Sequence, residues 1–148
     1  MKMTPELKKA KENMEPGKIT SSGFLGEDTR EIVDIIEKDE EIFKNLDLNF
    51  DEVCEKLQYY LEEGKKGLGE PITVDGKYTV KIDEARGFLP CPFEDGIFRK
   101  INATLINNEN NEKIIYSELS LHLLKKHHFC QGYGSEFRID PLIIKKIL

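Results

Sequence analysis

Hydrophobic residues follow a helical spacing through most of the first half of the chain. Over 29–44, apolar residues recur every three or four positions and charged residues occupy the opposite face, which predicts an amphipathic helix. Asp28, followed three residues later by Glu31, is typical of a capping box at its start. The same spacing over 50–65, opened by Asn49, predicts a second helix. Because only a few residues separate the two, we expect an antiparallel helical hairpin.

The second half of the chain changes to an alternation of apolar and polar residues, which is typical of half-buried strands. This alternation predicts strands over 78–83, 97–106 and 113–116. The first two are separated by 86–96, which contains two prolines and two glycines and reads as a loop. The last two are joined by a polar hairpin turn. The three strands therefore form a small antiparallel meander.

Shorter helices begin and end the chain. Thr4 begins a lysine-rich helix that ends before the Pro-Gly pair at 16–17. Ser117 begins a helix that runs to about His128. Asp140, followed by a proline at the first helical position, begins a closing helix that continues to the end of the chain.

This order of elements predicts an α+β fold. We expect an N-terminal helical hairpin packed on a small antiparallel three-stranded meander, with two C-terminal helices on the same face. Residues 1–148 form a single domain, in which 1–70 are the acidic helical half and 71–148 are the sheet with the C-terminal helices.

Charge and composition narrow the possible partners. The net charge is -6. Residues 1–70 hold 18 acidic and 11 basic side chains, whereas residues 71–148 hold 10 and 11. An acidic half without a basic stripe disfavours nucleic acid as a partner.

No apolar run reaches the ~20 residues of a membrane span, and the charged N-terminus is unlike a secretory signal. Three cysteines, an odd number, indicate a reducing cytoplasm. A small molecule or another protein remains as the partner, and the oligomeric state is left open.

The chemistry of the chain is concentrated near the third main helix. All three histidines, His122, His127 and His128, lie within seven residues, and Cys130 follows closely. Cys91 stands between two prolines. Imidazole nitrogen and thiolate sulfur are ligands that zinc prefers. The sequence therefore predicts a zinc site. Its ligands are Cys91, His122, His127 and Cys130, with His128 or water as alternatives for the fourth position.

An ideal helix does not support every part of this site. His122 and His127 are about 140° apart on a helical wheel, so they should not both point at one ion. On this wheel His127 lies on the leucine side and His122 on the polar side. A purely structural role for these residues is the stronger alternative, because no CxxC or HExxH pair is present. His127 would then lie at the edge of the core, and Cys91 would fill an apolar pocket.

Three functional hypotheses follow. The leading one is a metal or ligand site where the loop around Cys91 meets the end of the histidine helix. If the protein is an enzyme, this would be metal-assisted hydrolysis with bound water as nucleophile. Candidate bases are Glu94, Asp95 and Glu118. The runner-up is a non-catalytic interaction or regulatory module that uses the acidic helical half. The third is a thiol enzyme in which Cys91 is the nucleophile and His122 or His127 the base.

A glycine-rich segment over 131–138 offers one further possibility. Consecutive backbone amides in such a segment can hold an anion, with Arg138 supplying the charge. The segment neither follows a strand nor opens a helix, so it lacks the context of a phosphate-binding loop. We therefore favour a plain turn.

Overall fold

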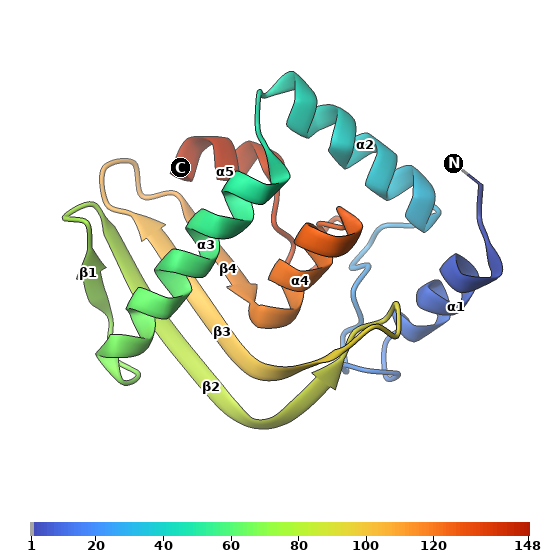
Figure 1. The fold of residues 1–148 in the computed structure, drawn as a ribbon, viewed down its shortest axis with the longest axis horizontal. Coiled ribbons are helices and arrows are strands. Elements are labelled where there is room, and N and C mark those ends of the chain that lie inside the picture. The colour runs from blue at the N-terminus through green and yellow to red at the C-terminus, as the bar shows by residue number, and fades with distance from the viewer. Residues whose placement is uncertain (1) are drawn as a thin grey trace.

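The computed structural model describes residues 2–148 and shows an α+β fold with five α-helices and one four-stranded sheet (Figure 1). The strands pair antiparallel in the order β1-β2-β3-β4, so the sheet is a meander and the predicted fold class is confirmed. The elements are α1 Pro5–Asn13, α2 Ile32–Asn45, α3 Phe50–Gly64, the 3-10 turn η1 Lys65–Gly67, β1 Ile72–Val74, β2 Tyr78–Pro90, β3 Ile97–Asn107, β4 Lys113–Ser117, α4 Glu118–His127 and α5 Pro141–Ile147.

Most helix starts are where the capping residues predict them. The side chains of Thr4, Asn49, Ser117 and Asp140 each accept a hydrogen bond from a backbone amide in the first turn of the helix that follows. The prediction for α2 was wrong. Its N-cap is Glu31, without a side-chain hydrogen bond, because the carboxylate of Asp28 accepts hydrogen bonds from Arg30 instead.

The sheet differs from the prediction in two respects. It has a fourth strand, β1, which spans three residues, too few for a recognisable alternation. In addition, β2 continues through most of the predicted loop and ends at Pro90. The pairing with β3 is interrupted by a β-bulge between Ala85 and Phe88 and then resumes. Gly87 in this bulge has a φ of 101°, which favours glycine. The bulge breaks the alternation, which is why the sequence suggests a loop.

The bulge also directs the far end of the β2–β3 ribbon. A bulge increases the bend and twist of a strand. The ribbon bends strongly and carries its connecting loop, residues 91–96, toward the C-terminal end of α4 (Figure 1). We call this segment the tip loop. The bend brings residues of the tip loop close to α4, which follows them by about thirty positions in the sequence.

The helices α3, α4 and α5 cover one face of the sheet (Figure 1). The predicted helical hairpin is only partly present, because α3 packs on the sheet and on α4 whereas α2 points away and contacts α1 and α5. The main core lies between these helices and the sheet; its largest buried members include Phe43, Leu57, Leu61, Leu105, Tyr116 and Leu124.

Helix α4 lies between two hydrophobic clusters. Leu121 and Leu124 belong to the main core, whereas Leu119 and Leu123 belong to a second cluster with α1, α2 and Cys91. Burial on both sides fixes the rotation of the helix, and with it the directions of its histidines. Within residues 2–148 we find no helix with the length and apolar character to cross a lipid bilayer.

Candidate metal centre

The tip loop is a tight turn that presents two potential ligands. The backbone amide of Cys91 donates to the carbonyl of Gly96 (2.8 Å), and the amide of Glu94 donates to the carbonyl of Cys91 (2.9 Å). Helix α1 holds the turn from outside, because the side-chain amide of Asn13 donates to the carbonyl of Pro92 (2.9 Å). These bonds fix the backbone that carries Cys91 and Asp95.

The carboxylate of Asp95 connects the tip loop to both histidines of α4. Its Oδ1 lies 2.9 Å from Nε2 of His122, and its Oδ2 lies 2.8 Å from Nε2 of His127. The helical-wheel argument that these imidazoles cannot meet was wrong. The wheel considers only the direction in which each side chain leaves the helix axis. In the structure, the carboxylate of Asp95 approaches from the tip loop and fits between the rings of His122 and His127, whose centroids are 5.5 Å apart.

Two phenylalanines set the orientation of the imidazole rings. Phe93 of the tip loop stacks on His127 with ring centroids 3.9 Å apart, and Phe98 of β3 lies against His122 at 4.4 Å. The side chain of His122 is therefore only 13% exposed, although the wheel places it on the polar side of the helix. The bent ribbon covers that side. Both rings are thus held before any ligand binds.

Burial and hydrogen bonding determine the protonation states of the group. Burial opposes ionisation of Asp95, but hydrogen bonds from Cys91, His122 and His127 outweigh it and hold its pKa well below the usual range. Burial, together with the hydrogen bond to Asp95, raises the pKa of Cys91 to about 12. Burial also lowers the pKa of His127, against the effect of Asp95. Without a metal ion the site therefore holds one carboxylate, a neutral thiol and a neutral imidazole at His127.

These four residues are close enough together that they could hold a metal ion. One ligand atom from each of Cys91, Asp95, His122 and His127 lies within 4.8 Å of the other three. Four ligands around tetrahedral zinc are about 3.3–3.8 Å apart, given metal–ligand bonds of about 2.0–2.3 Å. The hydrogen-bonded nitrogen–oxygen pairs at 2.8 and 2.9 Å would therefore separate by less than 1 Å on binding an ion.

Three of the four ligands predicted from the sequence come together here, and the fourth does not. Cys130 lies outside this group; its buried thiol is beside Asp39 and Arg138. Asp95 takes the fourth position. Sequence reasoning included Asp95 only as a possible base, because nothing local shows that a residue four positions after Cys91 faces the same point.

His128, the alternative fourth ligand, has a separate set of contacts. Its Nδ1 lies 2.8 Å from the carboxylate of Glu40, and its ring stacks on Phe50 with centroids 3.9 Å apart. It has a positive φ of 51° at the end of α4, which turns it away from the other two histidines. His128 therefore has the same kinds of neighbours as His127, a carboxylate and a phenylalanine, without a thiol.

A groove of about 650 Å³ between α3 and α4 reaches the candidate metal centre at His122. Cys54, Tyr59, Phe98 and Leu121 form apolar parts of its wall. Asp95 is the most exposed member of the candidate site, with 38% of its side chain accessible, whereas Cys91 is 1% exposed. A molecule could therefore approach the group from the side of Asp95 and His122.

No protein-family model, no curated protein and no solved structure matches this chain. The residues of the site are therefore the basis for assigning it a function.

Proposed function

We propose that this protein binds a divalent transition metal, with zinc as the best match, through Cys91, Asp95, His122 and His127. The observation that carries this proposal is the mutual approach of four potential ligand atoms to within 4.8 Å. Two of the residues come from the tip loop and two from α4, so the clustering is a product of the fold and not of a local acidic run.

The ligand types favour zinc over the alkaline-earth ions. Mg²⁺ and Ca²⁺ prefer all-oxygen sites, whereas a thiolate with two imidazoles and one carboxylate suits zinc. Binding requires that Cys91 lose its proton, which a nearby metal ion promotes, and that His122 and His127 carry their remaining proton on Nδ1. Zinc binding therefore releases a proton to solvent.

The simplest role of the metal is to hold the tip loop on α4. Four protein ligands close a tetrahedral coordination sphere, which is typical of structural zinc. The hydrogen bonds of Asp95 and the stacking of Phe93 already bring the two elements together. The metal would replace these hydrogen bonds with stronger coordination bonds and stabilise the bent ribbon.

Metal titration with matched variants tests the proposal. Protein purified without chelator, and chelator-treated protein titrated with Zn²⁺, should each contain about one zinc per chain. Cys91→Ser, His122→Gln and His127→Gln should each lower the affinity at least tenfold, the effect expected from the loss of one ligand. With Co²⁺ in place of zinc, a sulfur-to-metal absorption band should be present in the native chain and absent in Cys91→Ser.

His128→Gln is the matched control. His128 has a carboxylate partner and a stacked phenylalanine like His127, but it lies outside the group. Zinc affinity should be unchanged in this variant. Failure to bind zinc at micromolar concentrations, or an equal loss of affinity in His128→Gln, would contradict the proposed site.

A metal-assisted hydrolase is the second candidate, and the accessibility of Asp95 favours it. If Asp95 moves aside, Cys91, His122 and His127 remain as three ligands, with the fourth position open to water or substrate. Asp95 would then act as base, and the groove beside His122 would hold the substrate. Asp95→Asn separates the two roles: a catalytic base predicts retained zinc with lost hydrolysis, whereas a ligand predicts weakened zinc binding.

The other two hypotheses have less support. Acidic residues of the helical half are engaged within the protein: Asp28 with Arg30, Asp39 with Arg138 and Glu40 with His128. Fewer carboxylates are therefore available to a basic partner. A thiol enzyme needs a reactive, accessible thiolate, whereas Cys91 is buried and the pKa of its thiol is raised to about 12.

A further inference from the structure

We propose that the protein has a second site, which binds a small molecule with an anionic group and an apolar body. The site is a cavity of about 570 Å³ between the bent β2–β3 ribbon, the segment 19–26 and the segment 131–137. We call it the anion cavity. Its volume lies within the range of about 300–1,000 Å³ that is usual for small-molecule pockets.

The two loop segments form a fixed wall. The amide of Glu27 donates to the carbonyl of Tyr133 (2.8 Å), and the amide of Gly132 donates to the carbonyl of Phe24 (3.0 Å). A Cβ on Gly132 would overlap the carbonyl of Leu25, so the segments approach as closely as glycine permits. Because hydrogen bonds join the segments 19–26 and 131–137 to each other, the cavity is present without a bound ligand.

Arg99 and Lys100 of β3 are the cationic residues that line the anion cavity. The side chain of neither residue forms an ion pair or a hydrogen bond with another residue of 2–148, in a chain whose net charge is -6. The one acidic residue that lines the cavity, Glu136, is exposed. Cationic side chains without carboxylate partners at a pocket favour an anionic ligand.

The other residues that line the anion cavity suit the apolar body and the polar group of such a ligand. Phe24 and Leu119 are buried apolar residues at the wall, and Phe137 is partly buried. The hydroxyl groups of Ser21 and Ser22 make no hydrogen bond to another residue of 2–148 and remain available as donors. The cavity therefore offers an apolar surface next to charged and hydroxyl donors, the combination that binds an amphiphilic carboxylate or phosphate.

The glycine-rich segment 131–138 thus has a different role from the one considered from sequence. Arg138 cannot supply the charge, because both of its terminal nitrogens donate to the carboxylate of Asp39 at 2.9 Å and the pair is buried. Instead, the segment supplies part of the wall, and the charge comes from β3. This charge could not be found locally because Arg99 and Lys100 are more than thirty residues away in sequence.

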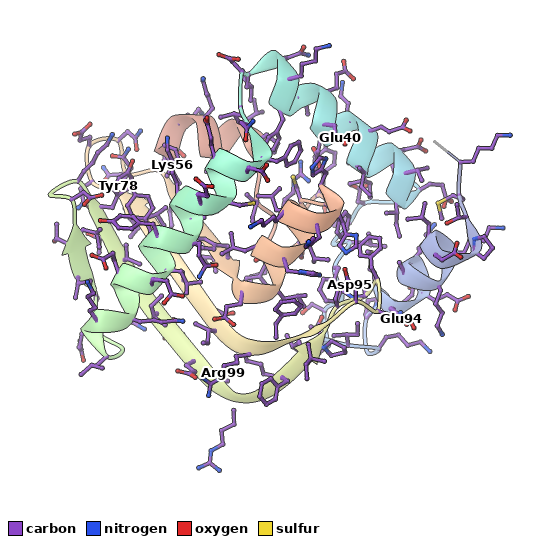
Figure 2. All side chains as sticks on the ribbon, in the orientation of Figure 1. Glu40, Lys56, Tyr78, Glu94, Asp95 and Arg99 are labelled. Carbon is purple, nitrogen blue, oxygen red and sulfur yellow. The ribbon has the colours of Figure 1, made fainter. Side chains whose placement is uncertain are left out.

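The anion cavity is separate from the metal centre. None of the four candidate metal ligands lines it. Figure 2 shows Arg99 on the bent part of the ribbon and Asp95 at its tip. The two proposals can therefore fail independently: a variant of Arg99 or Lys100 should leave zinc affinity unchanged, and His122→Gln should leave anion binding unchanged.

Calorimetric titration with four probes tests the proposal. Octanoate and octyl phosphate carry both features, 1-octanol lacks the charge, and inorganic phosphate lacks the apolar chain. We expect one of the two amphiphilic anions to bind at least tenfold more tightly than octanol and inorganic phosphate. Their relative affinities identify the carboxylate or the phosphate as the preferred head group. Arg99→Gln and Lys100→Gln should each weaken binding about tenfold, whereas Lys100→Arg should largely restore it.

Lys44→Gln is the control, because it removes the same charge from the exposed end of α2. Amide chemical shifts of the native chain should change over 19–26 and 131–137 on addition of the tighter probe. Circular dichroism checks that each variant is folded. Absence of binding at millimolar concentrations overturns the proposal, as do shift changes confined to other segments or an equal loss of affinity in Lys44→Gln.

Discussion

Asp95 Oδ2 lies 2.8 Å from Nε2 of His127, the last residue of α4, across 32 positions of sequence. This contact, with its counterpart to His122 at 2.9 Å, joins the tip of a bent β-ribbon to the end of a helix. The ligands of the candidate metal centre are therefore gathered by protein hydrogen bonds. A metal ion would have little left to organise, which favours tight binding.

Zinc is expected to stabilise the folded protein through this centre. At a free zinc concentration about 100 times the dissociation constant, the free energy of unfolding should rise by about 2.7 kcal/mol if the unfolded chain does not bind the ion. Urea unfolding of chelator-treated and zinc-loaded protein measures this difference. It should be smaller by at least about 1.3 kcal/mol in His122→Gln, whose zinc affinity is expected to be at least tenfold lower, and it should be retained in His128→Gln. Equal stabilisation of all three proteins would place the bound zinc elsewhere.

The buried ion pair between Arg138 and Asp39 should be the most sensitive charged contact of the fold. The two side chains are 6% and 0% exposed. Arg138→Ala leaves the carboxylate of Asp39 buried without its partner, which typically costs about 3–5 kcal/mol. The midpoint of urea unfolding should fall accordingly. Arg86→Ala, which removes an exposed arginine at the bulge, should change the free energy of unfolding by less than about 0.5 kcal/mol. Similar effects of the two substitutions would show that the ion pair does not stabilise the fold.

Local sequence signals were sufficient for most of the helix starts. Asn49 and Ser117 cap helices where predicted, because the interaction of a cap with the first turn depends on neighbouring residues alone. The same signal was misleading at Asp28, where Arg30 competes for the carboxylate that would otherwise cap α2. The bulge at Gly87 was not predicted either, since two unpaired residues, Arg86 and Gly87, interrupt the strand so that the segment resembles a loop.

The candidate site could be predicted only in part, because its residues come from segments that are far apart in the sequence. The composition of 122–130 identifies histidines as possible ligands, and these residues are close in sequence. The sequence does not show which cysteine joins the histidines. The bend of the ribbon brings Cys91 to α4, whereas Cys130 is buried beside Asp39. These relationships arise from tertiary packing, so a pattern of residue types cannot reveal them. Asp95 was missed as a ligand for the same reason.

Acidification should weaken the contact between Asp28 and Arg30. Hydrogen bonds from Arg30, opposed by burial, lower the pKa of Asp28 from 3.8 to about 2. Because the pKa is lower in the folded than in the unfolded chain, the contact stabilises the fold above pH 4, and the stabilisation is lost as the pH falls from about 4 to 2. At neutral pH it amounts to about 2 kcal/mol.

Asp28→Asn measures this contribution. The difference in free energy of unfolding between the native chain and the variant should be constant from pH 7 to 5 and decrease toward pH 2. Arg30→Gln should remove most of the same pH-dependent part, and the double variant should add little to it. A difference that does not vary with pH would contradict the assignment to the carboxylate of Asp28.

Gly87→Ala tests whether the bulge positions the metal centre. An alanine Cβ would have room, since its nearest neighbour is Cε of Lys100 at 3.7 Å, but the φ of 101° is unfavourable for a residue with a Cβ. We expect a loss of about 1–2 kcal/mol in the free energy of unfolding, together with zinc affinity reduced several-fold, because relaxation of the bulge would move the tip loop relative to α4. Gly69→Ala is the matched control: its φ is 93° and its Cβ would also meet open space. Gly69 shortly precedes β1, the strand at the other end of the sheet from the tip loop (Figure 1). Gly69→Ala should show a similar loss of stability without a change in zinc affinity. Equal zinc affinities in the two variants would mean that the bend at Gly87 is not what brings Cys91 and Asp95 to the histidines.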